Sequence, residues 1–203
     1  MHILIVAATE SEVADLKPRL ERNADLLITG VGMVATAVRC ARLLAQDNFD
    51  LVLNVGLCGS FDPGLKPGTV VHVARDRIAE LGAEDGDTFL TMTELKLPAA
   101  CEFTNLSPPN IAALKELQVV SGVTVNTAHG NERSIAALVE RYAPQVESME
   151  GAAFMSACLV SGVRFAQVRA VSNIVERRNR SAWRIPDALA ALTRSTLRIL
   201  EGL

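Results

Sequence analysis

A short strand passes directly into a helix at Val146-Glu147-Ser148-Met149-Glu150-Gly151-Ala152-Ala153, residues 146–153. One helix later, an apolar strand at 165–175 carries Asn173 near its end. This order predicts a β-α-β unit, with the carboxylate of Glu150 at the start of its helix and a carboxamide near the end of its second strand. Ligands of open α/β sheets bind beside the carboxyl ends of the strands. The unit therefore predicts both a class of fold and the edge of the sheet where a site should lie.

Strand and helix patterns alternate along the whole chain. The expected strands cover residues 2–8, 25–29, 51–55, 69–80, 88–93, 118–125, 146–149 and 165–175. The expected helices cover residues 10–21, 33–46, 132–142, 150–161 and 187–201. Residues 56–68, rich in Gly and Pro, and the proline-containing segment 95–110 are expected to be loops. The alternation predicts one α/β domain over residues 1–203, with a mixed or mainly parallel sheet covered by helices on both faces.

The composition is that of a protein with a sizeable apolar core, because 49% of the residues are hydrophobic and 21% are charged. The net charge of -3 gives no electrostatic reason to expect nucleic acid or an anionic membrane surface. No apolar run approaches the roughly 20 residues of a membrane span, and the first residues form a strand pattern instead of a signal sequence. Four scattered cysteines favour free thiols in a reducing cytoplasm, and the three histidines lack metal-ligand spacing.

The segment between the first expected strand and its helix is acidic, Thr9-Glu10-Ser11-Glu12. Acids are favoured at a helix N-terminus by the helix dipole, and Thr9 is a suitable N-cap. By itself the segment is therefore more typical of an ordinary helix start. The alternative is that Glu12 points back over the edge of the sheet into a pocket.

One glycine cluster follows the second expected strand, Gly30-Val31-Gly32-Met33-Val34-Ala35. It matches a dinucleotide-binding fingerprint, but it does not follow the first strand, and no acidic residue ends a strand about 20 residues later. A tight turn that needs glycine is the preferred interpretation. The helix after this turn has four apolar residues spaced to share one face: Val34, Val38, Ala41 and Ala45.

A second cluster of small residues ends the third expected strand, Asn54-Val55-Gly56-Leu57-Cys58-Gly59-Ser60. Small residues such as Cys58 and Gly59 let a ligand approach backbone amides closely. A tight turn explains them equally well. Neither glycine cluster holds the Lys or Arg that would mark a phosphate loop.

Three further residues stand at informative places. A Glu in the first turn of a helix, such as Glu150, is ordinary for dipole reasons, and Asn173 is a common turn former. Arg169 is harder to explain, because it lies in the apolar run 165–171 and arginine is rarely buried without a partner. We expect Arg169 to pair with a carboxylate, in a structural or a catalytic role.

Together these segments resemble the purine nucleoside phosphorylase superfamily, and within it the hydrolytic branch that contains methylthioadenosine/S-adenosylhomocysteine nucleosidase. The resemblance covers nearly the whole chain in order: Ala-Ala-Thr-Glu-Ser-Glu-Val (7–13), Thr-Gly-Val-Gly (29–32), Asn-Val-Gly-Leu-Cys-Gly-Ser (54–60), Met-Glu-Gly-Ala-Ala (149–153) and Val-Arg-Ala-Val-Ser-Asn (168–173). The pair Ser172-Asn173 and the segment 176–183 are similar to the futalosine hydrolases, which release hypoxanthine from futalosine in menaquinone biosynthesis. The resemblance implies a three-layer fold with a central mixed sheet flanked by helices.

The resemblance also implies how the bond between sugar and base is cleaved, through an oxocarbenium-like transition state. It places Glu12 as the general base that orients the attacking water, with Arg169 helping to hold that water. It places Glu150 on the ribose hydroxyls and Met149 against the sugar. Ionised acids beside a sugar that becomes cationic stabilise the transition state more than the ground state. Activation of water opposite the leaving group is also how inverting glycosidases work.

The adenine-specific nucleosidases of the family carry Asp where this chain has Asn173. Adenine offers a donor amino group at position 6, and a carboxylate can only accept. Hypoxanthine offers an acceptor oxygen there, to which Asn173 can donate while its carbonyl oxygen accepts from a protonated N7. A mismatch in such a contact can cost a factor of about 10⁴, so the sequence predicts hypoxanthine as the product and leaves the source of the N7 proton open.

Water is predicted as the nucleophile because the first loop, residues 7–12, contains two acids and no basic residue. Two carboxylates within several ångströms of a phosphate would repel it strongly. The benzoate of futalosine could pair with an arginine, and each candidate is also explained as a solvated surface residue. The candidates are Arg133, Arg177, Arg178 and Arg180.

Residues His129, Gly130 and Asn131 match the place where family members hold the edge of the base with backbone groups. The resemblance further implies a homo-oligomer, with the Gly30–Gly32 turn and its helix near an interface, and no metal or organic cofactor. Three alternatives stay open: an adenine-releasing nucleosidase acting on aminodeoxyfutalosine or methylthioadenosine/S-adenosylhomocysteine, an NAD-dependent oxidoreductase, and a non-catalytic nucleoside sensor.

Overall fold

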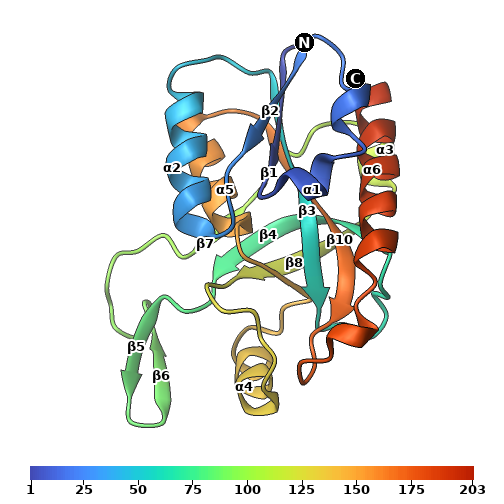
Figure 1. Cartoon of the computed structure of the whole chain (residues 1–203). Coiled ribbons are helices and arrows are strands. Elements are labelled where there is room, and N and C mark those ends of the chain that lie inside the picture. Colours follow the sequence, from blue (N-terminus) through green and yellow to red (C-terminus); the bar gives the residue numbers. More distant parts are fainter.

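The computed structural model describes residues 1–203 and places all but two of its strands in one sheet. The strands of this sheet are β1 (Ile3–Ala7), β2 (Ala24–Ile28), β3 (Leu51–Ser60), β4 (Val70–Ile78), β7 (Glu102–Thr104), β8 (Gln118–Thr124), β9 (Val146–Ser148) and β10 (Phe165–Ile174). They are ordered β10-β4-β8-β9-β3-β1-β2, with β7 paired to β4. β10 also pairs with β3, so β3, β10, β4, β8 and β9 close into a ring from which β1 and β2 extend (Figure 1).

The sheet is mixed, as the alternation of elements predicts. β1 runs parallel to both β2 and β3, and β3 runs parallel to β10. β4 is antiparallel to β10, and β9 is antiparallel to β3. The carboxyl ends of β1, β3 and β10 consequently face the same side of the molecule.

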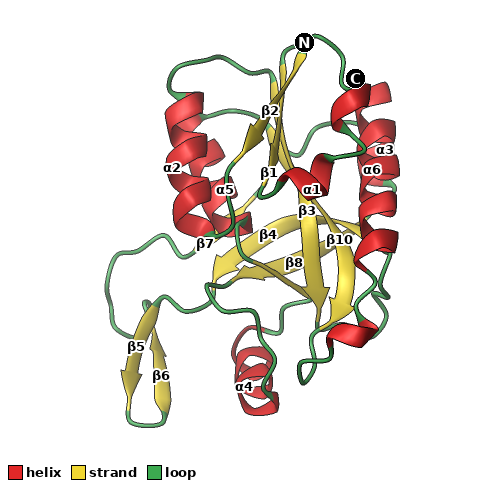
Figure 2. Ribbon diagram, in the orientation of Figure 1, coloured by secondary structure: helices red, strands yellow, loops and turns green.

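Helices cover both faces of the sheet. They are α1 (Glu10–Val13), α2 (Met33–Leu44), α3 (Ala112–Lys115), α4 (Glu132–Tyr142), α5 (Gly151–Ser161) and α6 (Ile185–Glu201), with 3-10 turns at Lys17–Arg19 and Arg180–Ala182. α2 and α5 pack together on one face, while α6 covers the other with α1 and α3 beside it (Figure 2). This is the expected three-layer α/β fold. None of the helices combines the length and apolar character needed to span a membrane.

The alternation of side chains along β1 divides the core in two. Ile3 and Ile5 point to the α6 side, where they belong to a cluster that includes Leu192. Leu4 and Val6 point to the opposite side, into a cluster built from α2 and α5. A continuous apolar strand is therefore required here, because both faces of β1 are buried.

The structure corrects two expected elements near the site. The helix expected at 10–21 is confined to Glu10–Val13, and the chain then enters a 3-10 turn that contains Pro18, which lacks the N–H of a helical hydrogen bond. The expected loop 56–68 begins later, because residues 56–60 continue β3 and pair with β10.

The region 69–110 is also arranged differently. The expected strand 69–80 is confirmed as β4, but the expected strand 88–93 is shortened to β6 (Thr88–Thr91), which forms a hairpin with β5 (Gly82–Asp85) that projects away from the main sheet (Figure 1). Within the segment 95–110, expected to be a loop, β7 pairs with β4. These short pairings depend on partners that the local sequence pattern does not reveal.

The apolar face expected on α2 exists but points outward. Val34 is 74% exposed and Val38 is 62% exposed, whereas Thr36 and Cys40 are buried. The buried side of α2 is thus set by its contact with α5, and its apolar stripe lies on the surface.

Candidate active site

A cavity of about 410 Å³ lies at the ends of β3, β9 and β10, beside the loop that follows β1. Its volume falls in the range of small-molecule sites. Most of the predicted site residues line it: Glu12, Cys58, Gly59, His129, Met149, Glu150, Ser172 and Asn173. The two predicted carboxylates and the predicted carboxamide therefore share one cleft, although they come from opposite ends of the chain.

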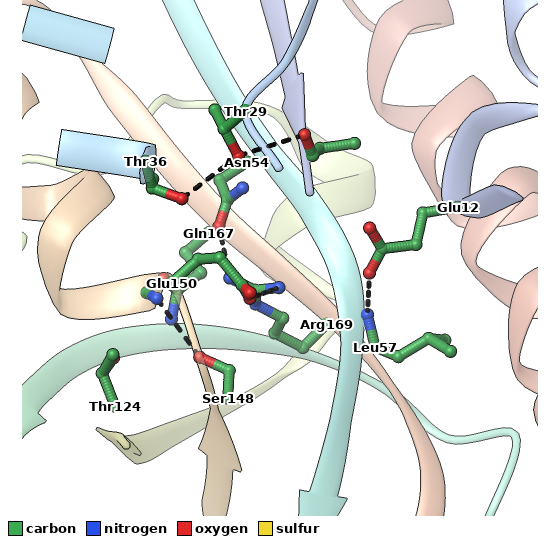
Figure 3. A network of polar contacts seen from close by, with 12 residues as sticks. Glu12, Thr29, Thr36, Asn54, Leu57, Thr124, Ser148, Glu150, Gln167 and Arg169 are labelled. Atoms are coloured by element: carbon green, nitrogen blue, oxygen red, sulfur yellow. Dashed lines mark hydrogen bonds and ion pairs between the residues drawn. The ribbon is translucent and has the colours of Figure 1, made fainter. Parts of the chain in front are cut away.

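Glu12 is held in place from two sides. One carboxylate oxygen accepts a hydrogen bond from the backbone N–H of Leu57 at 3.1 Å (Figure 3). The other accepts from the backbone N–H of Thr9 at 2.9 Å and from its hydroxyl at 3.1 Å. Glu12 thus belongs to its helix start and also lines the cavity, so the two interpretations of its segment are compatible.

Glu150 precedes the first residue of α5, but its side chain does not cap that helix. One carboxylate oxygen accepts from the backbone N–H of Gly32 at 3.1 Å, and the other lies 3.5 Å from the guanidinium of Arg169. Gly32 has φ of +102°, a conformation that favours glycine. The turn that resembles a dinucleotide fingerprint therefore presents its amide to a carboxylate of the same chain.

Arg169 lies behind the wall of the cavity and is 1% exposed. Its guanidinium donates to the side-chain oxygen of Asn54 at 2.5 Å and pairs with Glu150 (Figure 3). The expected carboxylate partner is confirmed. A Cβ on Gly56 would lie 2.3 Å from the Arg169 guanidinium and 2.9 Å from the Glu12 carboxylate, so only glycine allows both groups to approach this point.

Asn173 and Ser172 form a neutral pair at the other end of the cavity. The Ser172 hydroxyl donates to the Asn173 carbonyl oxygen at 2.8 Å, and the Asn173 amide donates to the backbone oxygen of Ile174 at 3.0 Å. A carboxamide NH₂ carries two donors. One N–H of Asn173 therefore stays available to a ligand.

Cys58 lines the same cavity but lacks the chemistry of a nucleophile. Burial raises the pKa of its thiol to about 12, and the nearby Arg169 opposes that shift only in part. Because the thiolate is the reactive form, Cys58 acts as a small neutral wall of the cavity.

Two predicted residues lie elsewhere. Gly130 and Asn131 line a separate hollow that also contains Arg133 and Arg177. Asn131 caps α4, its side-chain oxygen accepting from the backbone N–H groups of Arg133 and Ser134. Asn131 is therefore explained as the N-cap of α4. Of the three predicted residues His129, Gly130 and Asn131, only His129 lines the main cavity.

The prediction missed a buried carboxylate in the cavity wall, Glu147. Its oxygens accept from the backbone N–H of His129 at 3.1 Å and contact the ring Nδ1 of His129 at 2.7 Å. Glu147 stands in the strand pattern 146–149, where its side chain carried no motif of its own. A charged residue within a short buried strand was the one available signal.

Asp76 is a second buried carboxylate, located beneath the cavity. It accepts from Thr124 at 2.9 Å and from Gln167 at 2.8 Å, while Thr124 in turn accepts from the backbone N–H of Ala152 at 2.7 Å. Burial raises the pKa of Asp76 to about 6. This network supports the first turn of α5 and, through it, the position of Glu150.

The sequence profile of the Phosphorylase superfamily matches residues 19–202. The chain belongs to the phosphorylase superfamily. Among its superfamily relatives, the futalosine hydrolase of Thermus thermophilus is 35% identical over 86% of this chain and 80% of its own length. The futalosine hydrolase of Streptomyces coelicolor is 38% identical over 86% of this chain and 77% of its own length.

Solved structures from the phosphorylase superfamily share the fold. The native structure of futalosine hydrolase of Helicobacter pylori superposes with a TM-score of 0.84, covering 100% of this chain and 98% of that one, at 14% sequence identity. At that identity the likeness supports the architecture alone. The similarity to futalosine hydrolases therefore rests on the two sequence relatives at 35% and 38% identity.

Proposed function

We propose that this protein hydrolyses the N-ribosidic bond of futalosine and releases hypoxanthine. The observation that carries the proposal is the single cavity shared by Glu12, Glu150 and Asn173. Sequence relatives at 35% and 38% identity are futalosine hydrolases. The reaction would place the protein in menaquinone biosynthesis, and residues 1–203 would act as one catalytic domain.

At the ribose end, Glu12 acts as the general base. Its carboxylate, fixed by Leu57 and Thr9, orients a water molecule toward the anomeric carbon. Arg169, buried behind the cavity wall, pairs with Glu150 and fixes its carboxylate beside the ribose hydroxyls, with Met149 against the sugar. As the sugar becomes cationic, the two carboxylates stabilise the transition state more than the bound substrate.

At the base end, Asn173 selects the leaving group. Its available N–H donates to O6 of hypoxanthine, and its carbonyl oxygen, now paired with Ser172, accepts from a protonated N7. Protonation of N7 lets the base accept the electrons of the broken bond. A carboxylate in place of Asn173 would face the O6 lone pairs, so the carboxamide favours 6-oxopurines.

Water is the nucleophile in this proposal. The loop over the attacking side contributes Thr9, Ser11 and Glu12 to the cavity and no basic side chain. A phosphate there would face the Glu12 and Glu150 carboxylates at short distance, which is unfavourable by several kcal/mol at an intermediate dielectric. The arrangement supports hydrolysis over phosphorolysis.

Arg178 is the guanidinium best placed for the benzoate of futalosine. It lines the cavity together with Trp183, and its guanidinium lies 5.5 Å from the centre of the Trp183 ring. Arg133 and Arg177 line the separate hollow beside α4. Trp183 suits the aromatic ring of the benzoate, and Arg178 suits its carboxylate, at the same end of the cavity.

The outward apolar stripe of α2 supports a homo-oligomer. Val34 and Val38 of α2 and Val31 of the turn before it are all more than half exposed, and exposed apolar side chains that gather on one surface mark interaction sites. We place the subunit contact on this helix. A cytoplasmic location agrees with the four cysteines, which are all free.

Product analysis tests the proposed function. The protein is incubated with futalosine, aminodeoxyfutalosine, inosine and methylthioadenosine, with and without phosphate. The expected result is hypoxanthine from futalosine at a rate independent of phosphate. A sugar 1-phosphate would exclude hydrolysis, and adenine released faster than hypoxanthine from the matched pair of substrates would exclude the assigned base.

A further inference from the structure

Glu147 is a buried charge that the proposed mechanism does not use. Its side chain is 7% exposed, and its ion-pair partner is a histidine, with no Lys or Arg in contact. Removing an ionised carboxylate from water is costly unless its oxygens are well satisfied. An uncharged Gln could accept the hydrogen bond from the His129 backbone and donate its amide to Nδ1 of the His129 ring, so these two contacts do not require an acid.

The position of Glu147 relates it to Asn173. In the sheet, Gly59 of β3 is the register partner of Asn173 on one side and of Glu147 on the other. The amide nitrogen of Asn173 and the Cγ of Glu147 both lie 3.4 Å from the point where a Gly59 Cβ would stand. The two side chains therefore converge over one glycine, and both line the cavity.

This arrangement matches the edge of a 6-oxopurine. Around that ring, O6 lies between the acceptor N7 and the donor N1–H. A carboxylate has about four lone-pair sites, and the contacts with His129 use two of them. On the basis of the proposed function, we propose that Glu147 accepts a hydrogen bond from N1–H of hypoxanthine and is a specificity-determining residue beside Asn173.

The same carboxylate rejects adenine. N1 of a 6-aminopurine carries a lone pair and no proton, so it would face the oxygens of Glu147 without a hydrogen bond. Glu147 and Asn173 then select the same base through adjacent atoms, one through N1–H and the other through O6. A site built on such contacts discriminates strongly, because a mismatched base leaves buried polar groups unpaired.

Base binding tests the inference with the full-length Glu147→Gln variant. Dissociation constants for free hypoxanthine and free adenine are measured by titration calorimetry and compared with those of the wild-type protein. We expect hypoxanthine to bind about 10- to 100-fold more weakly, the size of one hydrogen bond to a charged group. Adenine should bind as before or more tightly, because the Gln NH₂ can donate to its N1.

Two further variants complete the experiment. Glu80→Gln is the matched control, since Glu80 also accepts from a backbone N–H and a side-chain N–H, those of Asn126, but lies outside the cavity. It should leave both constants unchanged. Glu147→Asp keeps the charge but shortens its reach, and should weaken hypoxanthine binding without any gain for adenine, which gives a second reading if the Gln variant does not fold.

The outcomes separate this inference from the proposed function. Equal changes for both bases in folded Glu147 variants, or no preference for hypoxanthine in the wild-type protein, would overturn the inference even if futalosine is hydrolysed. A preference for hypoxanthine that depends on Glu147, in a protein that does not cleave futalosine, would support the inference and overturn the proposed function.

Discussion

The two ends of the cavity are built from different kinds of groups. At the ribose end, Glu12 and Glu150 are full charges, fixed by the backbone amides of Leu57 and Gly32 and by Arg169. At the base end, the neutral Ser172 and Asn173 stand beside the Glu147 carboxylate; Asn173 keeps an N–H without a partner in the protein, and Glu147 uses only two of its lone-pair sites, on His129. The first end is complete without a ligand, whereas the second has bonding capacity left over.

The ribose end should therefore set the rate of bond cleavage, and the base end should set which base is accepted. Preorganised charges act on whatever sugar is bound, because they respond to charge that develops during the reaction. Spare donors and acceptors act on the identity of the base, because a wrong partner leaves them unsatisfied. Mutations at the ribose end should therefore slow all nucleosides alike, and mutations at the base end should change which nucleoside is preferred.

The largest effect is expected at the ribose end. Glu12→Gln removes the base that orients water, and kcat should fall by up to about 10⁴-fold for every substrate. Hypoxanthine binding should stay unchanged, because Glu12 does not contact the base. Steady-state kinetics and titration calorimetry measure the two quantities, and a loss confined to one base would contradict the division between the two ends.

The next largest effect is expected at Asn173. Asn173→Asp should lower kcat/KM for futalosine by roughly 10³-fold, because a carboxylate then faces O6 of the leaving group. Aminodeoxyfutalosine should lose much less, since its 6-amino group can donate to that carboxylate. Equal losses on the two substrates, measured side by side, would show that Asn173 does not read position 6.

The Asp76 network that supports the first turn of α5, next to Glu150, should respond to pH. The pKa of Asp76 rises from 3.8 to about 6 through burial, so the folded protein holds this proton more tightly than the unfolded chain does. The stabilisation of the folded state by the protonated Asp76 is complete below about pH 4 and is lost as the pH rises through about 6. Over that range, the unfolding free energy of the wild-type protein should fall by about 3 kcal/mol relative to Asp76→Asn.

Denaturant unfolding at several pH values measures this difference. The Asn variant can keep both contacts, because the unpaired carbonyl oxygen of Gln167 can accept from the new amide once the Gln167 side chain turns over. Parallel pH profiles for the two proteins would show that Asp76 ionises normally in the folded state.

The smallest effect is expected at the mouth of the cavity. Arg178→Gln should raise the KM for futalosine about tenfold through loss of one charge-assisted hydrogen bond. Hydrolysis of inosine, which has no benzoate, should be unaffected. Arg177→Gln is the matched control, because Arg177 lines the neighbouring hollow, and a similar rise in both variants would point to a general loss of positive charge.

The sequence was sufficient for the architecture and for most of the cavity. Glu12 and Asn173 follow the strand-end rule for α/β sheets, but each of the residues Glu12, Glu150 and Asn173 was ambiguous by itself, and the family resemblance assigned them to one site. The burial of Arg169 with a carboxylate was predictable because an isolated guanidinium is not stable in an apolar run. The Arg169 prediction rests on burial alone, whereas the others also needed the resemblance.

The remaining features depend on contacts between distant segments. The continuation of β3 through residues 56–60 requires β10, which lies far along the chain. The outward direction of Val34 and Val38 is decided by the contact of α2 with α5, because periodicity gives a face but not its orientation. Glu147 gained its importance from the convergence of two strands on Gly59, which no local pattern encodes.

The pairing of β3 with β10 has a consequence for how the protein is made. Asn54 and Arg169, which meet in the folded protein, are 115 residues apart in the chain. Contacts at such separation close late in folding, and β10 leaves the ribosome after all the other strands of the sheet. A nascent chain therefore carries β3 with an open edge and Glu12 without the buried cation behind it, so activity and a finished sheet should arise in the same event.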